Sequence, residues 1–477
     1  MKIYGAGTEE AASALKQSKI RIAVYGLGKM GLPLAAVFAD AGAIVAGIDI
    51  SKSVVDIINK GANTVKEEPG LDELVKRGVA AGRLKAYPSS QKADLHIILV
   101  PTLLRGTKPR KRSSRGAARP HDAPAVDMTP VLDCAKSIAK VLEKGDIVIT
   151  ECTMPPGSTE KLIPILEKSG LKANKDFGIG HCPERTMTGT AIRDITGEYP
   201  KVVGAGDRAA LDALRGIYSA INKSGVVQCS SIRAAECVKV FEGIYRDVNI
   251  ALANEMAVWC DREGLDALEI FKIANTQKYC HIHKPGCGVG GHCIPYYPHF
   301  IMDRQTALIR LARKTNEDMA KYAVKLAAEA LKSAGVKPKD ASVLVLGLTF
   351  RAGVKEFAHT MAKPIIEETK KVAGRIYASD PLCGAEDAKH FGAEWMDISE
   401  QWSVVSDQKT SAGKKRKQGF KDIDAIIITT DDKSFRKLAW AKIAKGMHTP
   451  IVVDGRNILN PEEMRKLGFK YFGIGRR

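Results

Sequence analysis

The sequence of 477 residues lacks any apolar run approaching the roughly 18–20 residues that a membrane-spanning helix needs. Near its start it also lacks the apolar core of a signal peptide, because Glu9 and Glu10 stand there, and we therefore expect a cytoplasmic protein. Its 10 cysteines do not suggest a disulfide framework in a chain of this length, and they favour thiols, metal ligands or a nucleophile. A hydrophobic content of 45% excludes wholesale disorder and a collagen-like repeat.

Acidic residues are in short supply as well, since 73 Lys and Arg face 54 Asp and Glu, which gives a net charge of +19. Two stretches carry more than half of this charge: residues 103–125, with seven bases and one acid, and residues 407–421, with six bases and one acid. Both lack a helix or strand period, so we expect solvated insertions. The alternative is contact with a polyanion. Neither stretch interleaves aromatic residues with its bases, however, and we do not expect a nucleic-acid partner.

A dinucleotide-binding pattern occupies residues 20–50. The apolar run at 20–26 predicts a buried strand, and a G-x-G-x-x-G turn, an apolar helix and a second strand follow it. In this pattern Gly26 permits a tight turn, Gly28 lets the backbone approach a pyrophosphate, and Gly31 lets helix and strand pack closely. The amides at the helix N-terminus favour the phosphate charge. The alternative is a glycine-rich turn that binds no cofactor.

Polar residues follow three of the predicted strands. Asp49 ends the second strand, where its carboxylate can accept hydrogen bonds from a ribose diol and would repel a 2′-phosphate, so the sequence predicts NAD rather than NADP. Pro101 and Thr102 end the strand predicted at 93–102, and Thr153 lies near the end of the strand predicted at 146–156. The predicted cofactor-binding residues are Gly26, Leu27, Gly28, Met30, Gly31, Asp49, Pro101, Thr102 and Thr153.

Residues 231–263 contain no proline and keep a helical apolar pattern, which predicts a helix of about 30 residues, or about 45 Å at 1.5 Å per residue. A helix of that length often connects two domains and forms a subunit interface. Lys239, Gly243 and Arg246 fall on one face of it by their spacing. The lysine by itself is more simply explained as a solvated charge.

Four glycines and two prolines crowd residues 284–295, which excludes regular structure there. Such a loop can lay its backbone against a ligand and present a cysteine from a fixed turn. A structural metal is the alternative because Cys and His residues gather between 280 and 293. Their spacings match no common zinc signature, and we predict no metal.

The last third predicts a second α/β unit, with strands at 342–350, 374–381, 424–432 and 449–457 that alternate with helical patterns. It has no complete glycine motif, so a second NAD is not expected there. The predicted fold class is α/β, with two Rossmann-like doubly wound domains joined by a central, mainly helical dimerisation domain. The predicted segments are an N-terminal extension (1–20), an NAD-binding domain (21–224), the central domain (225–335) and a C-terminal domain (336–477).

Six motifs of the sequence resemble those of the nucleotide-sugar 6-dehydrogenases, the UDP-glucose/GDP-mannose dehydrogenase family, and they occur in the same order along the chain. Within it, the sequence is most similar to the subgroup that oxidises UDP-N-acetyl-D-mannosamine. The motifs are ECTMPPGST (151–159), HCPERT (181–186), RDVNIALANE (246–255), PGCGVGGHCIP (285–295), VLGLTF (345–350) and DGRNIL (454–459).

The resemblance implies a four-electron oxidation of the sugar C6 alcohol to a carboxylate with two NAD. Cys293 matches the family nucleophile, which forms a thiohemiacetal and then a thioester, and Lys239 matches the lysine that stabilises the oxyanions. Glu184 matches the base for thioester hydrolysis, and Thr153 matches a residue that holds the water.

The resemblance also implies that the C-terminal unit binds UDP and that the central helix forms a homodimer. The substrate-binding residues it implies are Glu184, Arg185, Lys239, Arg246, Asn249, Gly288, Gly290, Gly291, His292, Phe350, Arg351 and Arg456.

Four positions depart from the family pattern. Gly243 stands where the family usually has Asn, and Tyr297 stands where it usually has Asp. In the C-terminal unit Ala358 falls at an arginine position, and Arg351 takes the place of a lysine. The alternatives within the family are a UDP-glucose or a UDP-GlcNAc 6-dehydrogenase. Outside it they are a two-electron hydroxyacid dehydrogenase and a polyanion-binding protein.

Overall fold

The computed structural model describes residues 1–104, 126–398 and 420–476. Most of the basic stretch at 103–125 and most of that at 407–421 lie outside the described residues. The chain divides into two compact units. Unit 1 is Met1–Glu242 with His299–Ile301, and unit 2 is Gly243–Pro298 with Met302–Arg477.

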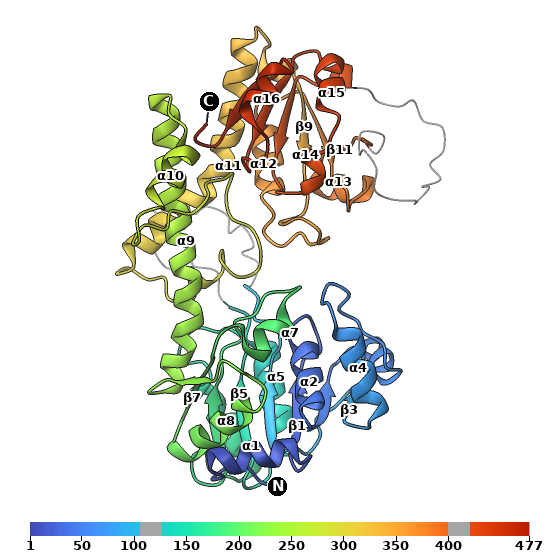
Figure 1. The fold of residues 1–477 in the computed structure, drawn as a ribbon, viewed down its shortest axis with the longest axis vertical. Helices are drawn as coiled ribbons and strands as arrows, with labels where there is room; N and C mark the ends of the chain where they lie inside the picture. The colour runs from blue at the N-terminus through green and yellow to red at the C-terminus, as the bar shows by residue number, and fades with distance from the viewer. Residues whose placement is uncertain (105–125, 399–419, 477) are drawn as a thin grey trace, which may run out of the picture. The chain divides into compact units, whose positions relative to one another are not determined.

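Unit 1 is built on an eight-stranded sheet with the order β3-β2-β1-β4-β5-β6-β7-β8 (Figure 1). Its strands are parallel except for the antiparallel pair β6 and β7. They run β1 (Arg21–Tyr25), β2 (Ile44–Ile48), β3 (Leu84–Tyr87), β4 (Leu95–Ile98), β5 (Ile147–Thr150), β6 (Gly178–His181), β7 (Lys201–Ala205) and β8 (Val226–Gln228).

One helix precedes these strands, and others connect them, because parallel neighbours need a crossover connection. They are α1 (Thr8–Lys16), α2 (Gly31–Asp40), α3 (Lys52–Asn59), α4 (Leu71–Ala80), α5 (Thr129–Ile138), α6 (Ile163–Leu166), α7 (Ala191–Arg193) and α8 (Arg208–Ser219). The first residues join this core, since Ile3 and Leu15 are fully buried and Lys2 forms an ion pair with Asp146 at 2.7 Å.

Unit 2 contains a six-stranded parallel sheet with the order β11-β10-β9-β12-β13-β14. Its strands are β9 (Ser342–Leu346), β10 (Arg375–Ser379), β11 (Glu394–Trp395), β12 (Ala425–Ile428), β13 (Ile451–Asp454) and β14 (Lys470–Gly473). Its helices are α10 (Ala267–Ala274), α11 (Ala307–Ser333), α12 (Ala362–Thr369), α13 (Ala385–Phe391), α14 (Lys433–Arg436), α15 (Trp440–Gly446) and α16 (Pro461–Lys466).

The long predicted helix is α9 (Ile232–Glu263), which Figure 1 shows as one continuous helix that begins in unit 1 and ends in unit 2. The predicted α/β class, with two doubly wound sheets and a central helical part, is confirmed. The predicted boundaries at 20, 224 and 335 stay predictions. No helix among the described residues is long and apolar enough to cross a membrane.

Each sheet reverses its strand order at one point, between β1 and β4 in unit 1 and between β9 and β12 in unit 2. In open α/β sheets, ligands bind at such points, beyond the carboxyl ends of the strands. Each of these points has a glycine with left-handed backbone directly after the first strand. Gly26 follows β1 with a φ of 95°, and Gly347 follows β9 with a φ of 102°.

Candidate functional site

The glycine turn after β1 has the geometry that a bound pyrophosphate requires. A Cβ on Gly26 would lie 2.5 Å from the carbonyl oxygen of Leu99, and one on Gly31 would overlap the carbonyl of Gly26. At Gly28 nothing lies within 4 Å of the place a Cβ would take, so the backbone there is open to a ligand. α2 begins at Gly31 and directs its free amides to this turn. These residues fit NAD.

Asp49 follows β2 and closes the turn. Its Oδ2 accepts a hydrogen bond from the Leu27 amide at 3.0 Å, and its Oδ1 accepts one from the Ser51 amide at 2.8 Å. Both carboxylate oxygens are therefore fixed in place and keep lone pairs for a ribose diol.

The ends of β4 and β5 are tied to each other. The Thr102 hydroxyl donates a hydrogen bond to the carbonyl of Thr153 at 2.6 Å. Pro101 is exposed beside this pair. The structure therefore brings together Thr102 and Thr153, which the sequence placed on separate strands.

Glu236 on α9 fixes the loop that carries Thr153, and the sequence reasoning missed it. Its Oε1 accepts hydrogen bonds from the Thr159 amide at 2.8 Å and the Thr159 hydroxyl at 2.7 Å, and its Oε2 accepts one from the Gly157 amide. The carboxylate is 1% exposed. The only local signal was a glutamate on an otherwise apolar helix face, three residues before Lys239.

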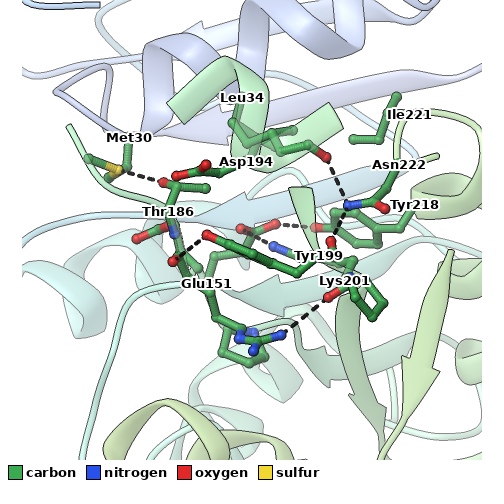
Figure 2. Close-up of a pocket in the computed structure, with 15 residues that line it drawn as sticks. Met30, Leu34, Glu151, Thr186, Asp194, Tyr199, Lys201, Tyr218, Ile221 and Asn222 are labelled. Atoms are coloured by element: carbon green, nitrogen blue, oxygen red, sulfur yellow. Dashed lines mark hydrogen bonds and ion pairs between the residues drawn. The ribbon is translucent and has the colours of Figure 1, made fainter. Parts of the chain in front are cut away.

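Glu184 and Arg185 follow β6 and line a cavity of about 20 Å³, which has room for one water molecule (Figure 2). The Glu184 carboxylate accepts a hydrogen bond from the Thr186 amide. Arg185 reaches α9, where its Nε donates to Glu242 at 2.7 Å. The Thr186 hydroxyl points to the sulfur of Met30 in the glycine turn, at 3.0 Å.

A second, buried acid lies in the wall of this cavity. Glu151 forms an ion pair with Lys201 at 2.7 Å and accepts a hydrogen bond from the Tyr218 hydroxyl, as Figure 2 shows. Burial raises the pKa of Glu151, against the opposing effect of Lys201, and the charge of Glu184 raises it further. Glu151 is the first residue of the motif at 151–159, but the sequence predicted no role for it.

The glycine-rich loop of unit 2 is irregular, as predicted, and its backbone is attached to the carboxyl edge of the second sheet. The Cys287 amide donates to the carbonyl of Gly455, after β13, at 2.8 Å. Arg456 crosses the same edge: its Nη1 donates to the carbonyl of Gly288 at 2.9 Å and its Nε to that of Thr429 at 2.7 Å. Arg456 and the loop glycines therefore form one surface.

Phe350 packs against this loop. A Cβ on Gly290 would lie 3.1 Å from the Cβ of Phe350, and one on Gly291 would lie 3.1 Å from its ring. The Arg351 guanidinium stands 5.8 Å from the centre of the same ring. His292 pairs through Nε2 with the Glu356 carboxylate. The structure thus gathers most of the predicted substrate-binding residues of unit 2 on one surface.

Cys293 is the exposed cysteine of the chain, since the other nine, which also lie in the described ranges, are buried or partly buried. Its neighbour Cys287 is fully buried, and burial raises the pKa of that thiol. Despite the crowding of Cys and His here, no group of three His, Cys, Asp or Glu side chains in the described ranges is placed to hold a metal ion.

Lys239, Arg246 and Asn249 lie on α9, at intervals of seven and three residues. The Asn249 side chain donates to the carbonyl of Tyr245 at 2.7 Å. Burial of the His283 ring lowers its pKa, and the Arg246 charge lowers it further.

Buried polar side chains hold the glycine loop on α9 and α11, and the sequence reasoning missed these too. The Gly286 amide donates to Asn254 Oδ1 at 2.9 Å, and Asn254 donates to Asn316 Oδ1 at 2.9 Å. Asn316 in turn donates to Asp247 at 2.8 Å, and Arg313 forms an ion pair with Asp247 at 2.6 Å.

Three family models match the chain. They describe the NAD binding domain (residues 20–222), the central domain (233–318) and the UDP binding domain (344–461) of the UDP-glucose/GDP-mannose dehydrogenase family. The UDP-N-acetyl-D-mannosamine dehydrogenase of Pyrococcus horikoshii is 33% identical, over 96% of this chain and 99% of its own.

Two solved structures share the whole fold. The structure of UDP-D-ManNAc dehydrogenase from Pyrococcus horikoshii has a TM-score of 0.80 at 32% identity, covering 96% of this chain and 99% of its own. That of NDP-N-acetyl-D-galactosaminuronic acid dehydrogenase from Methanosarcina mazei has a TM-score of 0.78 at 27% identity, covering 98% of each chain.

Proposed function

Because the chain belongs to the UDP-glucose/GDP-mannose dehydrogenase family and is an NAD-dependent oxidoreductase, we propose that it oxidises the C6 alcohol of a UDP-sugar to the acid in two steps. We propose UDP-N-acetyl-D-mannosamine as the sugar nucleotide, the substrate in the name of the Pyrococcus horikoshii relative. UDP-glucose and UDP-GlcNAc are the alternatives. The observation that carries the proposal is a single exposed cysteine on a glycine loop held at the edge of the second sheet.

We assign covalent catalysis to Cys293, whose exposure leaves its sulfur accessible to a substrate aldehyde. The thiolate adds to the C6 aldehyde and gives a thiohemiacetal. Oxidation of that adduct gives a thioester, and water then displaces the thiolate to release the acid. Over the whole reaction one water enters, and two hydrides and two protons leave. NAD, when bound, accepts the hydride in both oxidations.

The residues of unit 1 supply charge and proton transfer in this proposal. The Lys239 ammonium stabilises the oxyanion of each tetrahedral adduct. Glu184 takes the proton of the attacking water, and its position in a cavity with room for one water supports that role. Thr153, whose carbonyl is fixed by Thr102, helps to hold the same water.

The second sheet is the proposed UDP site. The left-handed Gly347 turn, the Thr429 and Thr430 side chains after β12 and the Arg456 guanidinium all lie beyond its switch point. Backbone amides and a guanidinium are suitable donors to a diphosphate. The match of residues 344–461 to the UDP binding domain of the family supports this placement.

Product stoichiometry tests the proposal. We expect two NADH per sugar acid, with the highest kcat/KM for UDP-N-acetyl-D-mannosamine in a panel that also contains UDP-glucose, UDP-GlcNAc, UDP-GalNAc and GDP-mannose. Cys293→Ala should abolish turnover and leave NAD binding unchanged, whereas the control Cys280→Ala should retain both. One NADH per turnover, with an aldehyde or ketone as product, would refute the thioester route.

We also propose a homodimer through the central helix. Tyr245, Leu252 and Trp259 follow one another at intervals of seven on α9, and each is about half exposed: 57%, 53% and 48%. An apolar stripe of this kind on a soluble surface is typical of an interface, and self-association with two-fold symmetry is the commonest way to cover one.

Light scattering after size exclusion tests the dimer. Leu252→Asp should shift the wild-type dimer to a monomer. Val227→Asp is the matched control, because Val227 is 50% exposed but lies on β8, outside α9. A wild type that elutes as a monomer, or a Leu252→Asp variant that stays dimeric, would contradict this assignment.

A further inference from the structure

Tyr297 connects the cysteine loop to α9. The amides of Tyr296 and Tyr297 both donate to the carbonyl of Cys293, at 3.0 and 3.1 Å, so Tyr297 is attached through one tight turn to the cysteine. The two side chains have opposite environments: Cys293 is exposed, whereas Tyr297 is only 7% exposed. The turn therefore buries the tyrosine ring and leaves the sulfur outside.

The tyrosine ring lies directly on the backbone of α9 at Gly243. A Cβ at this position would overlap Cδ2 of the ring and stand 3.0 Å from both Cγ and Cε2. Gly243 has ordinary helical backbone, so no left-handed conformation explains a glycine there. Glycine is unfavourable inside a helix. The close approach of the Tyr297 ring is what requires it.

We propose that Gly243 and Tyr297 form one interlocking pair that positions Cys293 on α9. This inference rests on the proposed role of Cys293 as the nucleophile. The ring fills the space that any side chain at 243 would need, so the cysteine turn can approach the helix backbone only when 243 is glycine. Gly243 stands one helical turn after Lys239, and the pair thereby sets where the cysteine turn meets the helix that carries the lysine.

The pair explains two departures from the family pattern as one. The family usually has Asn at 243 and Asp at 297. An Asn side chain at 243 is incompatible with the ring of Tyr297, because its Cβ alone would overlap that ring. A tyrosine at 297 therefore requires a residue without a Cβ at 243. Tyr297 is a positioning residue in this scheme and takes no part in the chemistry.

A double-mutant cycle tests the pair, with Gly243→Ala, Tyr297→Ala and the double variant. The first readout is the rate at which iodoacetamide alkylates Cys293, located by mass spectrometry, without sugar or NAD. The second is kcat. We expect Gly243→Ala to change the alkylation rate at least tenfold and to lower kcat about 100-fold. In the double variant the clash is gone, so the alkylation rate and kcat should each return by at least tenfold toward the values of Tyr297→Ala.

Controls separate positioning from general damage. Glu255→Ala, an exposed change on the same helix, should leave both readouts within twofold of wild type. If Gly243→Ala fails to fold, the double variant should restore soluble protein. Effects that simply multiply in the double variant, or a double variant that does not rescue folding, would overturn the proposal. Alkylation needs no turnover, so it judges the pair even if the NADH stoichiometry refutes the thioester route.

Discussion

His181 makes the stability of unit 1 depend on pH. It ends β6, its side chain is 1% exposed, and its Nδ1 is 2.8 Å from the Thr150 hydroxyl. Its Nε2 is buried without a hydrogen-bond partner among the described residues. Burial, with a smaller effect from the Lys201 charge, lowers the pKa of His181 from 6.5 to about 3. The folded protein therefore keeps this imidazole neutral through mildly acidic pH.

The sign and size of the effect follow from proton linkage. Between pH 6.5 and 3 the unfolded chain binds a proton at His181 that the folded chain does not bind, so stability is full above pH 6.5 and is lost as the pH falls. With an unfolded pKa of 6.5, the loss from pH 7 to pH 5 is about 2 kcal/mol. This figure is insensitive to the folded value as long as that value stays well below 5.

Urea unfolding followed by far-ultraviolet circular dichroism at pH 7, 6 and 5 checks this. His181→Asn keeps a group near the Nδ1 position but cannot titrate. The free energy of unfolding of wild type minus that of His181→Asn should therefore fall by about 2 kcal/mol from pH 7 to pH 5. Acidic groups such as Glu143, whose pKa Lys2 and Lys92 lower to about 2, cancel in this difference.

A flat difference for His181→Asn would refute the reasoning, because it would mean that the folded protein protonates His181 as readily as the unfolded chain does.

Three further predictions concern residues that the fold places in fixed contacts. Glu236→Gln should lower the free energy of unfolding of unit 1 by about 2–3 kcal/mol in urea, because the neutral amide would present an N–H to buried donors. The control Glu255→Gln on the same helix should lower it by less than about 0.5 kcal/mol. Equal effects of the two variants would contradict the role of the Glu236 contacts with the loop. Asp49→Ala should raise the KM for NAD about 10–100-fold and reduce the preference for NAD over NADP. Initial-rate kinetics with both cofactors measure this. An unchanged preference would show that the Asp49 carboxylate is not its cause. Arg313→Met should lower the free energy of unfolding of unit 2 by about 3 kcal/mol, because the buried charge of Asp247 would lose its cation. Tryptophan fluorescence in urea measures this loss, and the exposed control Lys314→Met should leave the free energy of unfolding nearly unchanged. A loss below about 1 kcal/mol for Arg313→Met would contradict the prediction.

Local patterns were enough to predict eight of the strands in the described residues, the glycine turn and the long helix. The apolar run at 20–26 became β1 (Arg21–Tyr25), and the proline-free stretch at 231–263 became α9 (Ile232–Glu263). These signals are read within one element, because a buried parallel strand needs a continuous apolar run and an amphipathic helix needs a 3.6-residue period.

Contacts between distant residues were not predictable in this way. Glu236 binds amides 77 and 79 residues earlier in the chain, and Tyr297 packs on a glycine of another element. No local period encodes either partner, since each depends on how loops of different length return to α9. For the same reason nothing in the pattern of residues 1–20 indicated that Ile3 and Leu15 would be fully buried in the core of unit 1.

The 3.6-residue period of α9 places two sets of residues, with two different roles, on opposite faces of the helix. Glu236, Gly243, Asp247 and Asn254 follow at intervals of seven, four and seven, and the 18 residues from first to last make about five turns, so all four lie on one face. That face binds the loop of Thr153, the ring of Tyr297, the Arg313 guanidinium and the glycine loop in turn.

The exposed stripe of Tyr245, Leu252 and Trp259 is displaced from Gly243 by two residues, or about 200°, and so occupies the opposite face. A polar or bulky change on the face of Glu236, Gly243, Asp247 and Asn254, the inner face, should therefore disturb the loops that carry the proposed chemistry. A change on the face of Tyr245, Leu252 and Trp259, the outer face, should alter only self-association. Leu252→Asp that becomes monomeric and still yields two NADH per sugar acid at the wild-type rate would show that the two faces act independently. A monomer without activity would show instead that the inner face needs the partner helix to stay in place.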